Sequence, residues 1–220
     1  MKILALEFSS SHRSVAVLDT NKAISQPPAT SRESDGRETH AFALIEKALS
    51  QAAIARGSID CICVGLGPGS YTGIRVAISL AQGWQLGRGI KLLGISSVEC
   101  LAAQATQRRM QGPLHIAIDA QRNEFYLARY LVTDSAAELK QSLQVVAAAE
   151  IKQIIAAGEQ VVGPDLSSLF AGATDLWPDA ATLARLAAGR TDFVAGEQLE
   201  PIYLRPATFV KAAPPRIVPE

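Results

Sequence analysis

The glycines of this 220-residue chain are concentrated in one stretch, which limits the folds that the chain can adopt. Eight of the 16 lie from Gly65 to Gly94, and the densest run, residues 67–73, follows the apolar segment 59–66 and precedes a helical pattern over 72–86. Glycine permits close backbone approach and φ values that other residues avoid. A buried strand, a glycine-rich turn and a helix in this order indicate an α/β protein.

Apolar runs and helical periodicity alternate along the rest of the chain. Gly112-Pro113 is a boundary signal that divides the chain into an N-terminal lobe, 1–111, and a smaller C-terminal lobe, 112–220, with an extended tail. The linker 27–35 is expected to be irregular, and residues beyond 211 to be disordered. Strands are expected over 3–8, 14–18, 23–26, 59–66, 91–95, 114–119, 124–132 and 160–163, and helices over 37–55, 72–86, 98–109, 147–157 and 180–188.

Composition excludes several classes of protein. Apolar residues make up 48% of the chain and the formal net charge is zero, which argues against disorder and against a strong, autonomous polyanion binder. The three cysteines, Cys61, Cys63 and Cys100, do not form a disulfide framework and are expected to be buried and reduced. The apolar start of the chain is too short for a signal peptide, and no window is long enough to span a membrane. A cytoplasmic protein is expected.

Two turns are candidates for binding a nucleotide or another anion. The first follows the opening strand and offers Glu7, Ser9 and Ser10; the second offers Gly67, Gly69 and Ser70 at the start of a helix, where free N–H groups can bind phosphate. The run 67–73 lacks the Gly-Lys-Ser/Thr ending of a P-loop and the spacing of the dinucleotide fingerprint. The alternative is structural: a polar turn with an unused acid, and a tight turn whose Ser70 caps the helix.

Neither a metal site nor hydrolase chemistry is predicted. The three histidines, His12, His40 and His115, are not spaced to share a metal, and His40 is expected to be a hydrogen-bonded structural residue on the first helix. Serine-hydrolase chemistry is not predicted, because the chain has no Gly-x-Ser-x-Gly elbow. Asp119, at the end of a strand, is a further acid that could simply hold its own turn.

The helix predicted over 72–86 carries a stripe of small residues. Gly73, Ala77 and Ala81 recur every four positions, flanked on one side by Ile74 and Ile78. Such a stripe lets a second helix approach closely, so these five residues are a candidate subunit interface. The alternative is that the stripe faces the sheet of the chain itself.

Several segments, in order along the chain, resemble one protein family. They are 2–7, then His40 on the first helix, 67–75, 81–83, 117–126 and 200–205. The chain resembles the bacterial tRNA threonylcarbamoyladenosine biosynthesis proteins of the TsaB (YeaZ) family, and the likeness covers nearly its whole length. It implies an α/β, actin-like ATPase (ASKHA) fold with two lobes, the second reduced. In actin-like ATPases an Asp-x-Gly-x-Ser/Thr turn holds a hydrated metal and phosphate; here Glu7 and Ser9 replace the Asp and Gly, which weakens such a site.

The resemblance also implies a role. It implies a non-catalytic subunit that scaffolds a TsaD-type catalytic subunit, acting with a TsaE-type ATPase to form threonylcarbamoyladenosine next to the anticodon of tRNAs. The catalytic relative holds its metal with a His-x-x-x-His pair, whereas this chain has His40 followed four residues later by Leu44. A homodimer in isolation, an interface that includes His40, tRNA contact only through the complex, and ATP or ADP only in the assembled complex are expected. The alternative is a small actin-like ATPase or kinase that uses Glu7 and the loop at Gly67.

Overall fold

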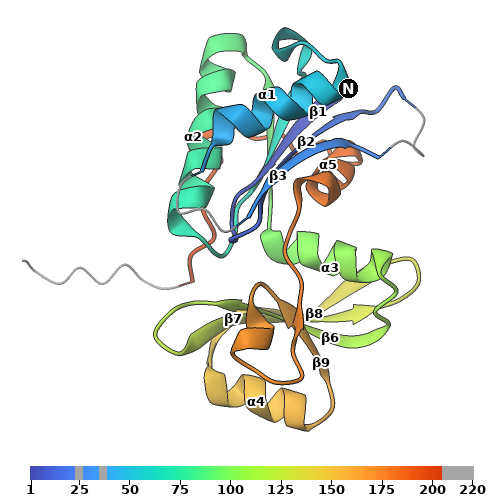
Figure 1. Ribbon diagram of the computed structural model, residues 1–220, viewed down its shortest axis with the longest axis vertical. Helices are drawn as coiled ribbons and strands as arrows, with labels where there is room; N and C mark the ends of the chain where they lie inside the picture. The colour runs from blue at the N-terminus through green and yellow to red at the C-terminus, as the bar shows by residue number, and fades with distance from the viewer. Residues whose placement is uncertain (23–26, 35–38, 205–220) are drawn as a thin grey trace, which may run out of the picture.

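The computed structural model describes residues 1–22, 27–34 and 39–204, which form two lobes stacked along the long axis of the molecule (Figure 1). Each lobe is built on a five-stranded sheet. The second sheet begins with β6 at Gly112, where the sequence predicts the lobe boundary. The predicted disorder beyond 211 and the predicted strand over 23–26 fall outside the described residues.

The sheet of the first lobe has the order β3-β2-β1-β4-β5. Its central strand β1 pairs antiparallel with β2 and parallel with β4; β2 pairs antiparallel with β3, and β4 parallel with β5. Both β1 and β4 are buried almost throughout, as their continuous apolar runs predict. The bounds are β1 Lys2–Glu7, β2 Arg13–Asp19, β3 Ala29–Glu33, β4 Cys61–Gly65 and β5 Lys91–Ile95.

The sheet of the second lobe repeats this plan. Its order is β8-β7-β6-β9-β10, with β6 antiparallel to β7, β7 antiparallel to β8, β6 parallel to β9 and β9 parallel to β10. This lobe is smaller than the first. Between its fourth and fifth strands, where every residue is described, the only helical element is the short turn Leu166–Ser168. The bounds are β6 Gly112–Asp119, β7 Glu124–Val132, β8 Ala137–Ala147, β9 Gln160–Gly163 and β10 Thr174–Asp175.

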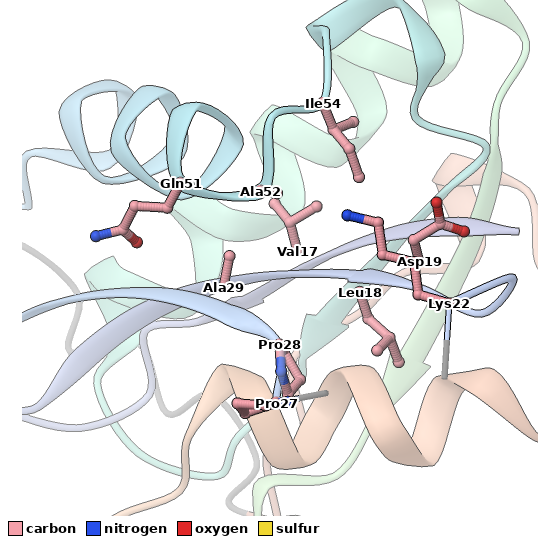
Figure 2. A pocket seen from close by; sticks show the side chains of 10 residues that line it. All are labelled: Val17, Leu18, Asp19, Lys22, Pro27, Pro28, Ala29, Gln51, Ala52 and Ile54. Carbon is pink, nitrogen blue, oxygen red and sulfur yellow. The ribbon is translucent and has the colours of Figure 1, made fainter. Parts of the chain in front are cut away.

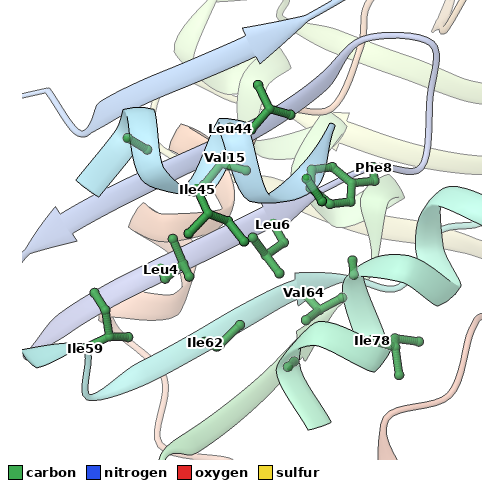
Figure 3. Packing of buried hydrophobic residues seen from close by; sticks show 14 of the residues in the cluster. Leu4, Leu6, Phe8, Val15, Leu44, Ile45, Ile59, Ile62, Val64 and Ile78 are labelled. Carbon is green, nitrogen blue, oxygen red and sulfur yellow. The ribbon is translucent and has the colours of Figure 1, made fainter. Parts of the chain in front are cut away.

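Helices cover both faces of each sheet, and each lobe contributes one helix that packs on the sheet of the other lobe. In the first lobe α1 and α2 share a core on one face (Figure 3), while α5 packs on the other face. In the second lobe α4 covers one face and α3 the other. Each helix that follows the fifth strand of a lobe therefore covers the sheet of the opposite lobe. The bounds are α1 Ala41–Ala52, α2 Tyr71–Arg88, α3 Ser97–Gln107, α4 Ala148–Ala156 and α5 Ala180–Ala188.

The segment after α5 stays on the first lobe. Val194 forms a bridge with Leu92 of β5, Leu199 is buried in the first core, and the Ile202 N–H donates to the Leu66 carbonyl at 2.9 Å. A division of the chain at residue 111 by sequence thus assigns α5 and the segment up to Leu204 to the second lobe, whereas both pack on the first.

Two sequence-based expectations are corrected at sheet edges. The linker predicted to be irregular contains β3, which pairs with β2 over five residues. A second strand that the sequence does not predict, β8, runs for 11 residues along the edge of the second sheet. β3 is largely polar, β8 is largely exposed, and each has one hydrogen-bonded neighbour, so neither is marked by a long apolar run.

Candidate functional site

The first candidate turn surrounds a carboxylate that is fully buried. Glu7 is the last residue of β1, and its Oε1 accepts a hydrogen bond from the Ser9 N–H at 2.8 Å. Its Oε2 accepts one from the Ser97 hydroxyl at 3.0 Å, and the Ser97 Oγ in turn accepts from the Gly67 N–H at 3.2 Å. Ser97 is the residue that sequence reasoning missed: it is the first residue of α3, directly after the N-cap Ser96. Both oxygens of Glu7 are therefore bound within the chain.

The second candidate turn packs directly against the first. The Ser70 N–H donates to the Ser9 carbonyl at 2.7 Å, and the Ser70 hydroxyl caps α2 by accepting from the Gly73 N–H. A Cβ on Gly69 would lie 2.1 Å from the Ser9 oxygen, and one on Gly73 would lie 2.0 Å from the Phe8 oxygen. The glycines thus make room for the backbone of the first turn.

Five of the six predicted nucleotide or anion residues are therefore neighbours whose polar groups bind within the chain: Glu7, Ser9, Gly67, Gly69 and Ser70. The sixth, Ser10, donates its hydroxyl to the His12 carbonyl at 3.2 Å. The fold class implies a nucleotide with its metal at this turn, and the groups present do not fit one. Glu7 has no exposed surface, and protein carbonyls occupy the space that Gly69 and Gly73 leave. Among the described residues no cluster of three histidine, cysteine or acidic side chains could hold a metal ion.

The lobes also touch each other at this turn. The Ser11 hydroxyl donates to Asp165 Oδ2 at 3.0 Å, and the His12 ring packs on Trp177 with 4.1 Å between ring centroids. The Trp177 indole N–H donates to the other oxygen of Asp165 at 3.2 Å. Ser11 and His12 belong to the first lobe and Asp165 follows β9 of the second, so the mouth of the turn is bridged by side chains.

Burial raises the pKa of Glu7 above its ordinary value, although hydrogen bonds from Ser9 and Ser97 lower it. The folded state therefore holds the Glu7 proton more tightly than the unfolded chain does. This contribution to stability is complete below the unfolded pKa, about 4.3, and is lost as the pH rises through the raised folded pKa.

Glu7→Gln is expected to become progressively more stable relative to the wild type as the pH rises above 5. The amide does not titrate, and it keeps an oxygen for the Ser9 N–H and a donor for Ser97. The difference should grow by at most about 1.4 kcal/mol per pH unit while Glu7 titrates. Urea unfolding of both proteins between pH 4.5 and 8 measures it. A difference that does not change with pH would contradict this expectation.

The predicted interface stripe is wrong in its placement. Gly73, Ala77 and Ala81 are buried, as are Ile74 and Ile78, because this side of α2 packs on the sheet of the chain itself. Another side of α2, about 120° around the helix axis, is exposed and carries a second small-residue stripe, Ser79, Gly83 and Gly87, which we call the outer stripe. A Cβ on Gly83 or Gly87 would meet no atom within 4 Å.

His40 and Asp119 lie at turns. His40 directly precedes α1, is exposed, and its Nδ1 lies 3.2 Å from Glu33 Oε2, so it is hydrogen-bonded as expected. Asp119 accepts from the Gln121 backbone N–H at 2.7 Å and thus holds the β6–β7 turn. Residues 121–123 of that turn all have positive φ values. None of these side chains completes a catalytic constellation.

Neither the three cysteines nor the hollow drawn in Figure 2 forms part of the candidate site. All three thiols are buried, and burial raises the pKa of Cys61 to about 12, which keeps the thiol protonated. The hollow, about 370 Å³, lies between the β2–β3 hairpin and the end of α1, and it contains none of the predicted site residues (Figure 2). No helix of the described residues has the length and hydropathy to span a membrane.

The two sheets have the same strand order, and each is covered on one face by a helix that follows the fifth strand of the other sheet. These features define a two-lobed α/β protein of the actin-like ATPase fold class. Residues 31–169, more than half of the chain, match the family described as TsaD, tRNA N6-adenosine threonylcarbamoyltransferase. The tRNA threonylcarbamoyladenosine biosynthesis protein TsaB of Escherichia coli K12 is 29% identical over 226 residues, covering 93% of this chain and 95% of that protein.

Solved structures agree. A Pseudomonas aeruginosa protein described as similar to peptidase YEAZ has a TM-score of 0.77 and 27% identity, covering 93% of this chain and 99% of that one. YeaZ from Pseudomonas aeruginosa has a TM-score of 0.75 and 26% identity, covering 92% and 99%. The chain belongs to the TsaD family and, within it, to the TsaB (YeaZ) group.

Proposed function

We propose that this protein is a non-catalytic subunit of the complex that forms threonylcarbamoyladenosine in tRNA, and that it scaffolds a TsaD-type catalytic subunit. The observation that carries the proposal is the closed turn at Glu7 in a protein of the TsaB group. A carboxylate with both oxygens bound inside the chain does not take part in phosphoryl transfer, which requires a metal and positioned phosphates. The chain has the actin-like fold, but the groups at the turn after Glu7 hold the two candidate turns together and do not bind a nucleotide.

The surface proposed for the partner is the outward side of α1 and α2. These helices lie on the same face of the first sheet (Figure 1). Phe42 on α1 and Tyr71 and Leu86 on α2 are large apolar side chains with 65%, 57% and 92% of their surface exposed. The outer stripe lies on the same exposed side of α2, and small residues allow a partner helix to come close.

The remaining assignments follow the same proposal. In the isolated protein, the outward side of α1 and α2 forms a homodimer contact, with His40 at the margin of that surface. In the complex, the TsaD-type subunit replaces the second copy of this chain on the same surface. A TsaE-type ATPase joins the complex, ATP or ADP acts in the assembled complex, and tRNA is bound through the complex. The protein works in the cytoplasm. It has no ATPase or kinase activity of its own.

Co-expression with the TsaD-type subunit of the same organism tests the proposal. We expect the two chains to co-purify, and we expect depletion of this protein to remove threonylcarbamoyladenosine from tRNA, as measured by nucleoside mass spectrometry. Unchanged modification after depletion would contradict the role. ATP hydrolysis by the isolated chain that Glu7→Ala abolishes would contradict the absence of catalysis.

A further inference from the structure

A cavity of about 280 Å³ lies at the junction of the two lobes, beside the contact between His12 and Trp177. Four structural elements contribute to its wall: the start of β2, the end of β3, the C-terminal half of α3 and the segment before α5. We call it the arginine cavity, because three arginines line it. The lining residues that matter are His12, Arg13, Arg32, Gln104, Arg108 and Trp177.

Two acids also line the arginine cavity, and both are already engaged. Glu33 lies 3.7 Å from the Arg13 guanidinium and binds His40. Asp179 caps α5 by accepting the Thr182 N–H at 2.7 Å, and it also accepts a hydrogen bond from the Gln104 amide. These bonds tie the acids to the protein and reduce their repulsion of an anion in the cavity.

The cations at the mouth of the cavity are less committed. Arg32 is exposed and reaches Asp179 only at 4.0 Å. Arg108, at the end of α3, is exposed and has no ion pair with any residue that the structure describes. The His12 ring also lines the cavity and supplies a ring N–H donor. Guanidinium groups converging on one recess are suited to bidentate binding of phosphate.

We infer that the arginine cavity binds a phosphate-bearing nucleotide unit, with the phosphate on Arg32 and Arg108 and the sugar or base against Trp177. The volume is near the lower end of small-ligand sites, so it admits one such unit. The unit comes either from a free nucleotide or from a residue of tRNA. The inference that the bound unit belongs to tRNA rests on the proposed function. The inference that the cavity binds phosphate does not.

Isothermal titration of the full-length chain at low salt tests the inference with three probes: inorganic phosphate, ADP and unmodified tRNA. We expect ADP or tRNA to bind, with a change in Trp177 fluorescence and weaker binding at higher salt. Arg32→Gln and Arg108→Gln should each weaken binding about tenfold or more, the loss typical of a charged hydrogen bond. Arg185→Gln is the matched control: this exposed arginine lies on α5 outside the cavity, and its loss should change binding less than about twofold.

The outcomes separate the sources. Binding of ADP without tRNA assigns the cavity to a free nucleotide, and tRNA binding that ADP displaces assigns it to RNA; either supports the inference. No binding of any probe at millimolar concentration, or equal binding by wild type, Arg32→Gln and Arg108→Gln, overturns it. Co-purification of the same variants with the TsaD-type subunit is measured separately. A failure to assemble contradicts the proposed function, whereas the ADP titration still tests the cavity on its own.

Discussion

Gly73→Ala is expected to lower the free energy of unfolding by about 3 kcal/mol or more, the upper part of the range for overpacked sites. The new Cβ would lie 2.0 Å from the Phe8 carbonyl oxygen, a contact with backbone that no rotamer change can relieve. Relief requires the start of α2 to move away from the β1–β2 turn, which disturbs the hydrogen bonds around Glu7. Urea or thermal unfolding measures the loss.

Gly83→Ala supplies the matched control on the same helix. Its Cβ would meet no atom within 4 Å, and alanine favours a helix over glycine by about 1 kcal/mol. We therefore expect a stabilisation of up to that size. Equal effects of the two substitutions would contradict the packing of α2 described above, because the same chemical change is made at a buried and at an exposed position of one helix.

Gly83→Trp is expected to abolish co-purification with the TsaD-type subunit while the isolated chain stays folded. The indole would stand on the outer stripe, where it keeps a partner helix from approaching, and overpacking of about 1–3 kcal/mol weakens association roughly 5- to 150-fold. Size-exclusion chromatography, co-purification and a thermal melt measure the two effects.

Ala77→Trp is the contrasting variant for this experiment. Ala77 is fully buried against the sheet of the chain itself, so a tryptophan there should unfold the first lobe rather than release a partner. An unfolded Gly83→Trp protein, or one that still assembles normally, would refute the placement of the interface on the outer stripe.

The sequence predicted the strands that contain apolar runs well, and it predicted the edge strands β3 and β8 poorly. β5, β7 and β9 have the predicted bounds, because apolar runs between turn signals define them. β3 and β8 were missed since each is an edge strand without a long apolar run: β3 is mostly polar, and β8 is mostly exposed. Local apolar periodicity therefore does not mark either of them.

The sequence indicates which residues the two candidate turns contain, and its structural alternative gives Ser70 the role that it has, the cap of α2. Proximity of Glu7, Ser9, Gly69 and Ser70 follows from turns at the ends of adjacent strands. Their mutual hydrogen bonds, and the part of Ser97, depend on tertiary placement. The interface failed for a similar reason: α2 has two small-residue stripes whose centres are about 120° apart around the helix, and helical geometry does not say which one meets the sheet.

The exchange of α3 and α5 between the lobes sets an order for biosynthesis. The first sheet emerges early from the ribosome, but the face that bears Ile3, Ala5 and Leu93 is covered mainly by α5. That face stays open to water and to other chains until almost nine-tenths of the protein has been translated. A nascent chain of this design therefore needs shielding during synthesis, and a fragment that stops at the lobe boundary should aggregate instead of folding.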